Sequence, residues 1–157
     1  MAKELSHIDA SGKANMVDVS EKETTKRTAI ASGKVFFPKE VFDTLSEQDF
    51  LGTKGSIIQT AIIAGIQGAK RTSELIPLCH QLKLSKVQVD IFPKANALEI
   101  QCKVSCTERT GVEMEALTGV SVSALTIYDM CKALSHDIKI GEIQLEHKTG
   151  GKHEFNR

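Results

Sequence analysis

The chain has 157 residues, of which 41% are hydrophobic and 25% charged, and its 20 basic and 20 acidic side chains give a net charge of zero. This length fits one domain, residues 1–157, that buries a core without a metal or disulfide staple. The neutral charge and an aromatic content of 4% argue against a nucleic-acid-binding module, and the sequence has no run of about 18 apolar residues that would span a membrane. The opening MAKELSHIDA lacks the apolar centre of a signal peptide, so the four cysteines are expected to be reduced thiols of a cytoplasmic protein.

Changes in hydrophobic period predict three elements in the first half of the chain. Thr28–Phe37 is typical of a strand, and Pro38–Gln48 of a short helix with proline in its first turn. Gly55–Arg71 has helical spacing, and the two glycines in its second half predict close packing against another backbone.

Four further elements follow in the second half. Alternating apolar residues predict strands over Val87–Ile91 and Leu98–Cys106, joined by the turn residues PKAN. Val112–Leu134 is expected to be a long helix rich in small residues. A last strand over Ile138–Leu145 changes side-chain parity at Gly141, which predicts a bulge or bend there.

The order of these elements is strand, helices, hairpin, long helix, strand. This order predicts an α+β ferredoxin-like sandwich, in which an antiparallel sheet carries its helices on one face. Residues 1–20 and 150–157 are polar and aperiodic, and are predicted to be flexible tails.

Common catalytic and metal-binding motifs are absent from the sequence. The stretch GTKGS does not fit the phosphate-loop pattern. Cys102 and Cys106 lie four residues apart on a predicted strand, and therefore about 13 Å from each other, too far to share one ion. We expect structural thiols here and no protein-bound metal.

Two polar positions, Lys54 and His80, have both an ordinary and a functional interpretation, and Lys70 has mainly an ordinary one. Lys54 is predicted at the beginning of a helix, where a cation is unfavourable, so it is either a solvated lysine or a phosphate clamp. Lys70 lies near the end of that helix, where positive charge is stabilising. His80 lies at an element boundary, and is either a structural hydrogen-bonding residue or a catalytic one.

The predicted long helix carries the most informative polar pattern. Glu113 and Glu115 occupy its first turn, where carboxylates suit the helix dipole. Asp129 and Lys132 share a face at a spacing of three residues, among apolar neighbours that predict partial burial. Such a pair can be structural, or it can supply an acid and a base.

Long stretches of the chain resemble the cyclic pyranopterin monophosphate synthase family of molybdenum-cofactor biosynthesis. The similar segments are MVDVSEKETTKRTA, TAIIAGIQGAKRTSELIPLCH, LSKVQVDI, TGVEMEALTGVSVSALTIYDMCKA and KTGGK, between about Met16 and Lys152. Two positions depart from the family pattern: Gln81 stands where proline is usual, and Gly119 where alanine is common.

The resemblance implies a ferredoxin-like fold and a homohexamer built from three dimers, with active sites at subunit interfaces. It implies a lyase that converts 3′,8-cyclo-7,8-dihydro-GTP into cyclic pyranopterin monophosphate and releases pyrophosphate. No redox change occurs in this step, so no cofactor is expected beyond a Mg²⁺ ion that can accompany the triphosphate.

The resemblance also assigns residues to the site. Asp129 matches the family's catalytic acid or base, and Lys132 can hold it ionised, deliver a proton or bind a phosphate. Glu115, with Glu113, can accept hydrogen bonds from a guanine-like edge, and His80 can bind sugar or phosphate or move a proton. The substrate-binding residues implied in this way are Lys54, Lys70, Leu78, Cys79, His80, Glu113, Met114, Glu115, Lys148 and Lys152.

Geometry separates two of these residues. Glu115 and Asp129 are 14 residues apart on one predicted helix, so about 21 Å separates them along its axis. A compact ring system cannot contact both within one subunit. We therefore predict a composite site, in which two chains meet antiparallel along this helix and approach closely at its small residues: Ala116, Gly119, Ser123 and Ala124.

Two other classes of function remain open at this stage. One is a non-catalytic nucleotide-binding ferredoxin-like module. The other is a metal-dependent phosphate hydrolase, which would need Glu113, Glu115 and Asp129 to fold together into a carboxylate cluster.

Overall fold

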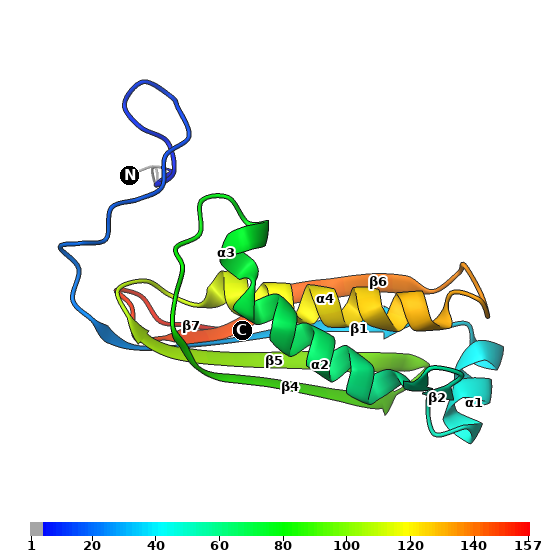
Figure 1. Cartoon of the computed structure of the whole chain (residues 1–157). Coiled ribbons are helices and arrows are strands. Elements are labelled where there is room, and N and C mark those ends of the chain that lie inside the picture. The colour runs from blue at the N-terminus through cyan, green and yellow to red at the C-terminus, as the bar shows by residue number, and fades with distance from the viewer. Residues whose placement is uncertain (1–4) are drawn as a thin grey trace.

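The computed structural model describes residues 5–157, and its main sheet has five strands in the order β4-β5-β1-β6-β7. All its neighbouring strands pair antiparallel. Helices α2 and α4 lie side by side on one face of this sheet (Figure 1). In chain order the elements are β1 (Thr25–Phe36), α1 (Lys39–Glu47), β2 (Leu51–Gly52), β3 (Gly55–Ser56), α2 (Ile57–Lys70), α3 (Thr72–Leu75), β4 (Leu84–Lys94), β5 (Ala97–Glu108), α4 (Glu113–Cys131), β6 (Lys139–Thr149) and β7 (Phe155–Asn156).

This arrangement confirms the α+β ferredoxin-like prediction. Helix α2 connects β1 to β4, and α4 connects β5 to β6, so each of the two large helices crosses the same face of the sheet. The strands β4 and β5 form the predicted hairpin. The added short strand β7 pairs with β6 at the edge of the sheet. No helix in the described part of the chain is long and apolar enough to cross a membrane.

The start of α2 differs from the prediction by two residues. Gly55 and Ser56 form the short strand β3, and the helix begins at Ile57. The Ser56 hydroxyl accepts a hydrogen bond from the Gln59 amide at 3.2 Å, which is the usual N-terminal cap. Lys54 therefore lies in the turn between β2 and β3, just before the helix.

The predicted turn and bulge are both present. Ala95 and Asn96 connect β4 and β5 with φ angles of 45° and 61°, which suit a tight two-residue hairpin. In the pairing of β1 with β6 the register shifts between Ser32 and Lys34, opposite the stretch next to Gly141. This bulge restores the facing of the side chains in the second half of β6.

The two predicted tails differ in how they lie against the body of the domain. Phe155 and Asn156 form β7 against Lys148 and His147, so the end of the chain lies along the sheet edge. The described part of the N-terminal segment, residues 5–24, projects from the other elements in Figure 1 and is mostly exposed.

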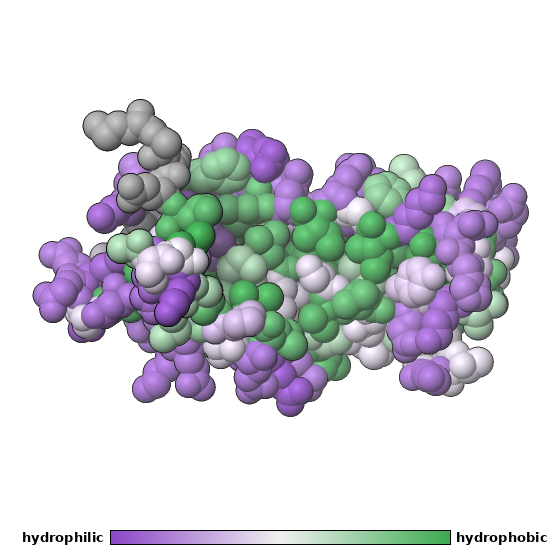
Figure 2. All heavy atoms as spheres, turned by 90° about the horizontal axis from the view of Figure 1, so that it is seen from above, coloured by the Kyte–Doolittle hydropathy of each residue, from purple (hydrophilic) through white to green (hydrophobic). Residues whose placement is uncertain are grey.

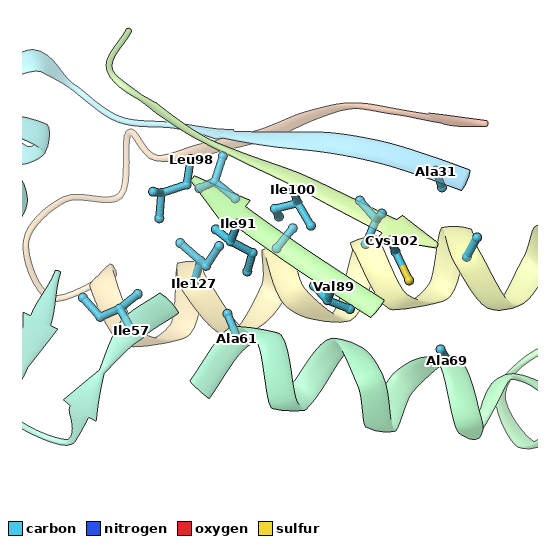
Figure 3. Packing of buried hydrophobic residues seen from close by; sticks show 14 of the residues in the cluster. Ala31, Ile57, Ala61, Ala69, Val89, Ile91, Leu98, Ile100, Cys102 and Ile127 are labelled. Carbon is cyan, nitrogen blue, oxygen red and sulfur yellow. The ribbon is translucent and has the colours of Figure 1, made fainter. Parts of the chain in front are cut away.

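The core lies between the sheet and the two helices. Alternate residues of β1 and β5, among them Ala31 and Ile100, point toward Ala61 on α2 and Ile127 on α4 (Figure 3). Small residues allow α2 and α4 to pack closely. As a result, the Ser123 hydroxyl on α4 donates a hydrogen bond to the Ala61 carbonyl oxygen on α2 at 3.0 Å. The predicted close backbone packing of α2 is confirmed.

The role predicted for the small residues of α4 is wrong. Ala116, Gly119, Ser123 and Ala124 are all buried inside the chain, against α2 and the sheet. A Cβ atom at Gly119 would lie 2.6 Å from the Cys102 sulfur, so the absence of a side chain serves packing within the subunit. These residues cannot line a surface between two chains.

The outer side of the helical layer has an apolar band. Figure 2 shows hydrophobic residues gathered along the middle of this side, with hydrophilic residues toward its ends. Ile63 on α2 is 58% exposed and Leu125 on α4 is 60% exposed. Contiguous apolar surface of this kind is typical of an interaction face.

Candidate active site

The predicted site residues lie at the two ends of α4. This helix runs unbroken over 19 residues, from Glu113 to Cys131. Glu115 and Asp129 are 14 residues apart on α4. At a rise of about 1.5 Å per residue, about 21 Å separates them along the helix axis. The structure therefore divides the candidate residues into a carboxyl-end group and an amino-end group.

An ion pair dominates the carboxyl-end group. Lys132 Nζ lies 2.7 Å from Asp129 Oδ1. The hydrogen bond from Lys132, its charge and the more distant charge of Lys54 lower the pKa of the Asp129 carboxyl. The same hydrogen bond raises the pKa of the Lys132 ammonium. Asp129 is therefore an ionised proton acceptor, and Lys132 a protonated donor beside it.

The partial burial predicted for this pair is wrong for the single chain. The side chains of Lys132 and Asp129 are 56% and 63% exposed. Their apolar neighbours Ile127 and Cys131 point into the core, while Asp129 is on the opposite side of the helix. The pair is open to a ligand or to another subunit.

Glu115 is the buried acid of the amino-end group. Only 5% of this residue is exposed. Burial, and in smaller part the charge of Glu113, raises the pKa of the Glu115 carboxyl to about 7. Burial, and in smaller part the charge of Glu115, raises the pKa of the Cys79 thiol. Near neutral pH the Glu115 carboxyl can therefore either accept or hold a proton.

The segment that follows α3 brings the sequence Leu78-Cys79-His80 to this end of α4. All three residues are half-buried. His80 Nε2 lies 2.7 Å from the carbonyl oxygen of Val17 and holds the N-terminal segment there. Met114 is exposed on the first turn of α4. The structure thus gathers the LCH and GVEME segments around one location.

A cleft of about 630 Å³ opens beside Glu113. Lys148 Nζ binds Glu113 Oε1 at 2.9 Å, and Lys152 lines the same cleft from the Gly150-Gly151 loop. The lining also includes Arg27 from β1 and Arg109 from the loop before α4.

Sequence reasoning did not single out these two arginines. Arg27 stands in the KETTKRTA stretch that carried the family resemblance, so its place beside a predicted strand was the available signal. Arg109 follows the hairpin by one residue and donates a hydrogen bond to the Ser20 carbonyl oxygen at 2.9 Å.

Lys54 and Lys70 stand at opposite ends of α2. Because α2 and α4 run in opposite directions, Lys70 lies toward the amino end of α4 and Lys54 toward its carboxyl end (Figure 1). Both side chains are exposed. One substrate molecule cannot use both lysines of a single chain, since α2 is about 20 Å long.

The described residues do not form a cluster of three or more side chains that could hold a metal ion. The four cysteines are free thiols. Burial raises the pKa of Cys102 to about 12 and that of Cys106 and Cys131 to about 11, so these three are protonated core residues. The carboxylates of Glu115 and Asp129 are too far apart along α4 to form the cluster that a metal-dependent hydrolase would need.

The fold and these groups define an α+β ferredoxin-like protein with an acid–base pair and a basic cleft at opposite ends of one helix. The chain matches the model of the MoaC family over residues 16–151, and it belongs to that family. It is 50% identical over 152 residues to the cyclic pyranopterin monophosphate synthase of Xanthomonas campestris, covering 96% of this chain and 92% of that protein.

Two other relatives carry the same name. The Campylobacter jejuni protein is 51% identical over 150 residues, which is 94% of each chain. The mitochondrial protein of Arabidopsis thaliana is 52% identical over 150 residues, covering 94% of this chain and 55% of the plant protein. The chain thus spans about half the length of the plant relative and nearly all of the bacterial ones.

Proposed function

We propose that this chain is a lyase that converts 3′,8-cyclo-7,8-dihydro-GTP into cyclic pyranopterin monophosphate and releases pyrophosphate. The relatives named above support the proposal. The observation that carries it is the exposed Asp129–Lys132 ion pair, with Lys54 nearby, in a chain of the MoaC family. The reaction opens and rebuilds a purine-derived ring system and then closes a cyclic phosphate, so it needs proton transfers and phosphate binding but no redox group.

Asp129 and Lys132 are the proposed catalytic residues. The lowered pKa of Asp129 keeps it as a carboxylate that can accept a proton during ring opening. The raised pKa of Lys132 keeps it protonated, so it can donate a proton to a ring nitrogen. Alternatively, it can bind the α-phosphate whose cyclisation expels pyrophosphate. Because the two groups are 2.7 Å apart, a proton that Asp129 accepts can pass to Lys132 after Lys132 has donated its own.

Glu115 is the proposed acceptor for the guanine-like edge of the substrate. A carboxylate can accept two hydrogen bonds from the N–H and NH₂ groups of that edge. The buried position excludes competing water and makes those bonds stronger. Met114 and the Leu78–His80 segment, which lie at the same end of α4, complete the proposed pocket for the ring system and sugar.

The phosphate groups are assigned to lysines, with no resident cofactor. Lys54, Lys70, Lys148 and Lys152 supply positive charge around the two ends of α4, and a Mg²⁺ ion can enter with the triphosphate. Lys148 also neutralises Glu113 through its 2.9 Å ion pair, which prevents that carboxylate from repelling a phosphate.

The separation of Glu115 from Asp129 requires two chains for one site. We propose that the apolar outer side of α2 and α4 forms a two-fold contact, which places the amino end of one α4 near the carboxyl end of the other. Ile63 and Leu125, each more than half exposed, supply apolar surface for that contact. Three such dimers would make the hexamer, and light scattering would then report a particle of six chains of 17.1 kDa each. The four free cysteines support a cytoplasmic location for this assembly.

Incubation with the cyclised nucleotide tests the reaction directly. The proposal predicts stoichiometric release of pyrophosphate and a product that becomes a fluorescent pterin after oxidation. Saturable binding of the nucleotide with no pyrophosphate release would contradict the proposal and favour a non-catalytic nucleotide-binding module. The Asp129→Asn variant is the matched negative control, since its side chain keeps the same shape.

A further inference from the structure

Lys54 lies in the turn of a small hairpin formed by β2 and β3. The two strands pair antiparallel, and both the turn and β2 are exposed. Within the described part of the chain no ion pair holds the Lys54 ammonium. Its charge nevertheless contributes to the lowered pKa of the Asp129 carboxyl. The position of this lysine therefore depends on what fixes the hairpin.

Phe50, the residue just before β2, anchors the hairpin in the core. Only 5% of Phe50 is exposed, whereas the next residue, Leu51, is 56% exposed. The Phe50 ring packs edge-on against Phe42 of α1, with the ring centroids 5.7 Å apart, and Phe42 in turn contacts Phe37. The Phe50 ring is therefore a buried attachment at the start of an exposed strand.

The backbone of Phe50 joins two helices. Its amide donates a hydrogen bond to the Leu45 carbonyl oxygen of α1 at 2.8 Å. Its carbonyl oxygen accepts a hydrogen bond from the amide of Ile57, the first residue of α2, at 3.0 Å. The hairpin thus leaves from a junction between α1 and α2, and these elements lie together at one end of the domain (Figure 1).

This junction uses a conformation that phenylalanine rarely adopts. The φ angles of Asp49 and Phe50 are 50° and 54°, in the left-handed region. This backbone is unfavourable for a bulky residue and persists only where the surrounding contacts fix it. Glycine would adopt the same φ without strain, so backbone conformation does not account for a phenylalanine here. The packing of its buried ring does.

We infer that Phe50 is a positioning residue that holds Lys54 at the carboxyl end of α4 for substrate binding. The buried ring fixes the junction between α1 and α2, the junction fixes the hairpin, and the turn of the hairpin carries Lys54. A contact to phosphate is weaker when the lysine backbone must also be ordered on binding. This inference rests on the proposed function for the role of Lys54, and it gives a core residue a part in substrate affinity.

Hydrogen–deuterium exchange tests the anchor without turnover. Phe50→Leu removes the ring, and Phe37→Leu is the matched control, because Phe37 is similarly buried in the same aromatic cluster but follows β1. In Phe50→Leu the amides of residues 51–57 should exchange about tenfold faster than in the wild type, because the hairpin then opens more easily. In Phe37→Leu their exchange should stay within about twofold of the wild type.

Steady-state kinetics with the cyclised nucleotide test whether the anchor acts through Lys54. We expect Phe50→Leu to raise KM by about five- to tenfold with kcat unchanged, and Phe37→Leu to leave KM unchanged. In the Lys54→Ala background, Phe50→Leu should change KM by less than about twofold, because the side chain that it positions is already absent. A general structural defect would instead raise KM by the same factor in both backgrounds.

The outcomes separate this inference from the proposed function. Wild-type exchange of residues 51–57 in a folded Phe50→Leu variant, or an equal effect on KM with and without Lys54, would overturn the positioning role. If Phe50→Leu does not melt cooperatively, Phe50→Met, which is closer in volume, replaces it in both measurements with the same outcomes decisive. A wild type that releases no pyrophosphate would overturn the proposed reaction, and the exchange comparison would then decide alone whether Phe50 holds the hairpin.

Discussion

Glu115 and Asp129 stand on nearly the same side of α4, about 21 Å apart, yet in opposite environments. Glu115 is 5% exposed, whereas the side chain of Asp129 is 63% exposed. The charge of the first carboxyl helps to raise the pKa of the half-buried Cys79 thiol, whereas the second carboxyl is open to solvent. One helix therefore presents a buried acid of raised pKa at one end and an exposed, ionised one at the other.

Substitution of the exposed pair should abolish chemistry and preserve the fold. We expect Asp129→Asn and Lys132→Ala to lower kcat by about 10²- to 10⁴-fold, the usual contribution of a general acid or base. Exposed ion pairs contribute little to stability, so the midpoint of thermal unfolding should change only slightly. Asp43→Asn, which removes a similar exposed pair with Lys39 on α1, is the control. Joint loss of activity and of the cooperative melt would instead indicate a structural pair.

The lysines at the two ends of α2 should affect substrate affinity. We expect Lys54→Ala and Lys70→Ala each to raise KM by about tenfold, with a weaker dependence of KM on salt, because each removes a charge-assisted contact to phosphate. Steady-state kinetics at low and high ionic strength measure both effects. Lys86→Ala, an exposed lysine on β4, is the control. Unchanged kinetics in both variants would remove these lysines from the phosphate site.

Much of the fold follows from local pattern. The alternation of Leu98, Ile100, Cys102 and Val104 on β5 matches a strand with one buried face, and all four residues are buried. The turn at Asn96 follows from local turn chemistry, and the parity change at Gly141 from hydrophobic alternation. These features depend on residues that are close in the sequence, so they can be predicted from the amino-acid sequence alone.

Other features depend on contacts that are distant in the sequence. The burial of Ser123 depends on a hydrogen bond to Ala61, 62 residues away, so a pattern of small residues could not show which surface they serve. The family resemblance named both Glu115 and Asp129, but only the folded chain reveals their different burial. Arg27 was missed because its place beside a predicted strand does not show that it lines a cleft until the Gly150-Gly151 loop folds next to it.

The raised pKa of Glu115 should make stability depend on pH. Burial moves this pKa from 4.5 to about 7, so the folded chain binds more protons than the unfolded one between these values. The resulting stabilisation is fully present below pH about 4.5 and is lost as pH rises through about 7.

Urea unfolding at pH 5 and pH 8 can measure this effect. Relative to the Glu115→Gln variant, the wild type should lose about 2.5 kcal/mol of unfolding free energy between the two conditions. The Glu47→Gln variant, at an exposed position on α1, should show no such difference from the wild type. A difference between wild type and Glu115→Gln that is the same at both pH values would exclude a titrating Glu115.

Close packing of α2 against α4 should make Gly65 sensitive to substitution. A Cβ atom there would overlap the Ser123 hydroxyl oxygen and lie 2.9 Å from the Gly119 carbonyl oxygen. We expect Gly65→Ala to lower the free energy of unfolding by about 1–3 kcal/mol through overpacking. Gly52→Ala, where a Cβ atom meets its nearest neighbour at 3.7 Å, is the control. Equal stability of the two variants in urea would contradict this packing.

The central claim is that one active site takes Glu115 from one chain and Asp129 from another, and subunit mixing tests it most directly. Glu115→Ala and Asp129→Asn subunits, each inactive alone, are exchanged, and the release of pyrophosphate from the cyclised nucleotide is measured. Random exchange makes half of the dimers mixed, and each mixed dimer holds one intact site, so about a quarter of the wild-type activity should return. Complete subunit exchange, verified by native mass spectrometry, with no recovery of activity would contradict the composite site.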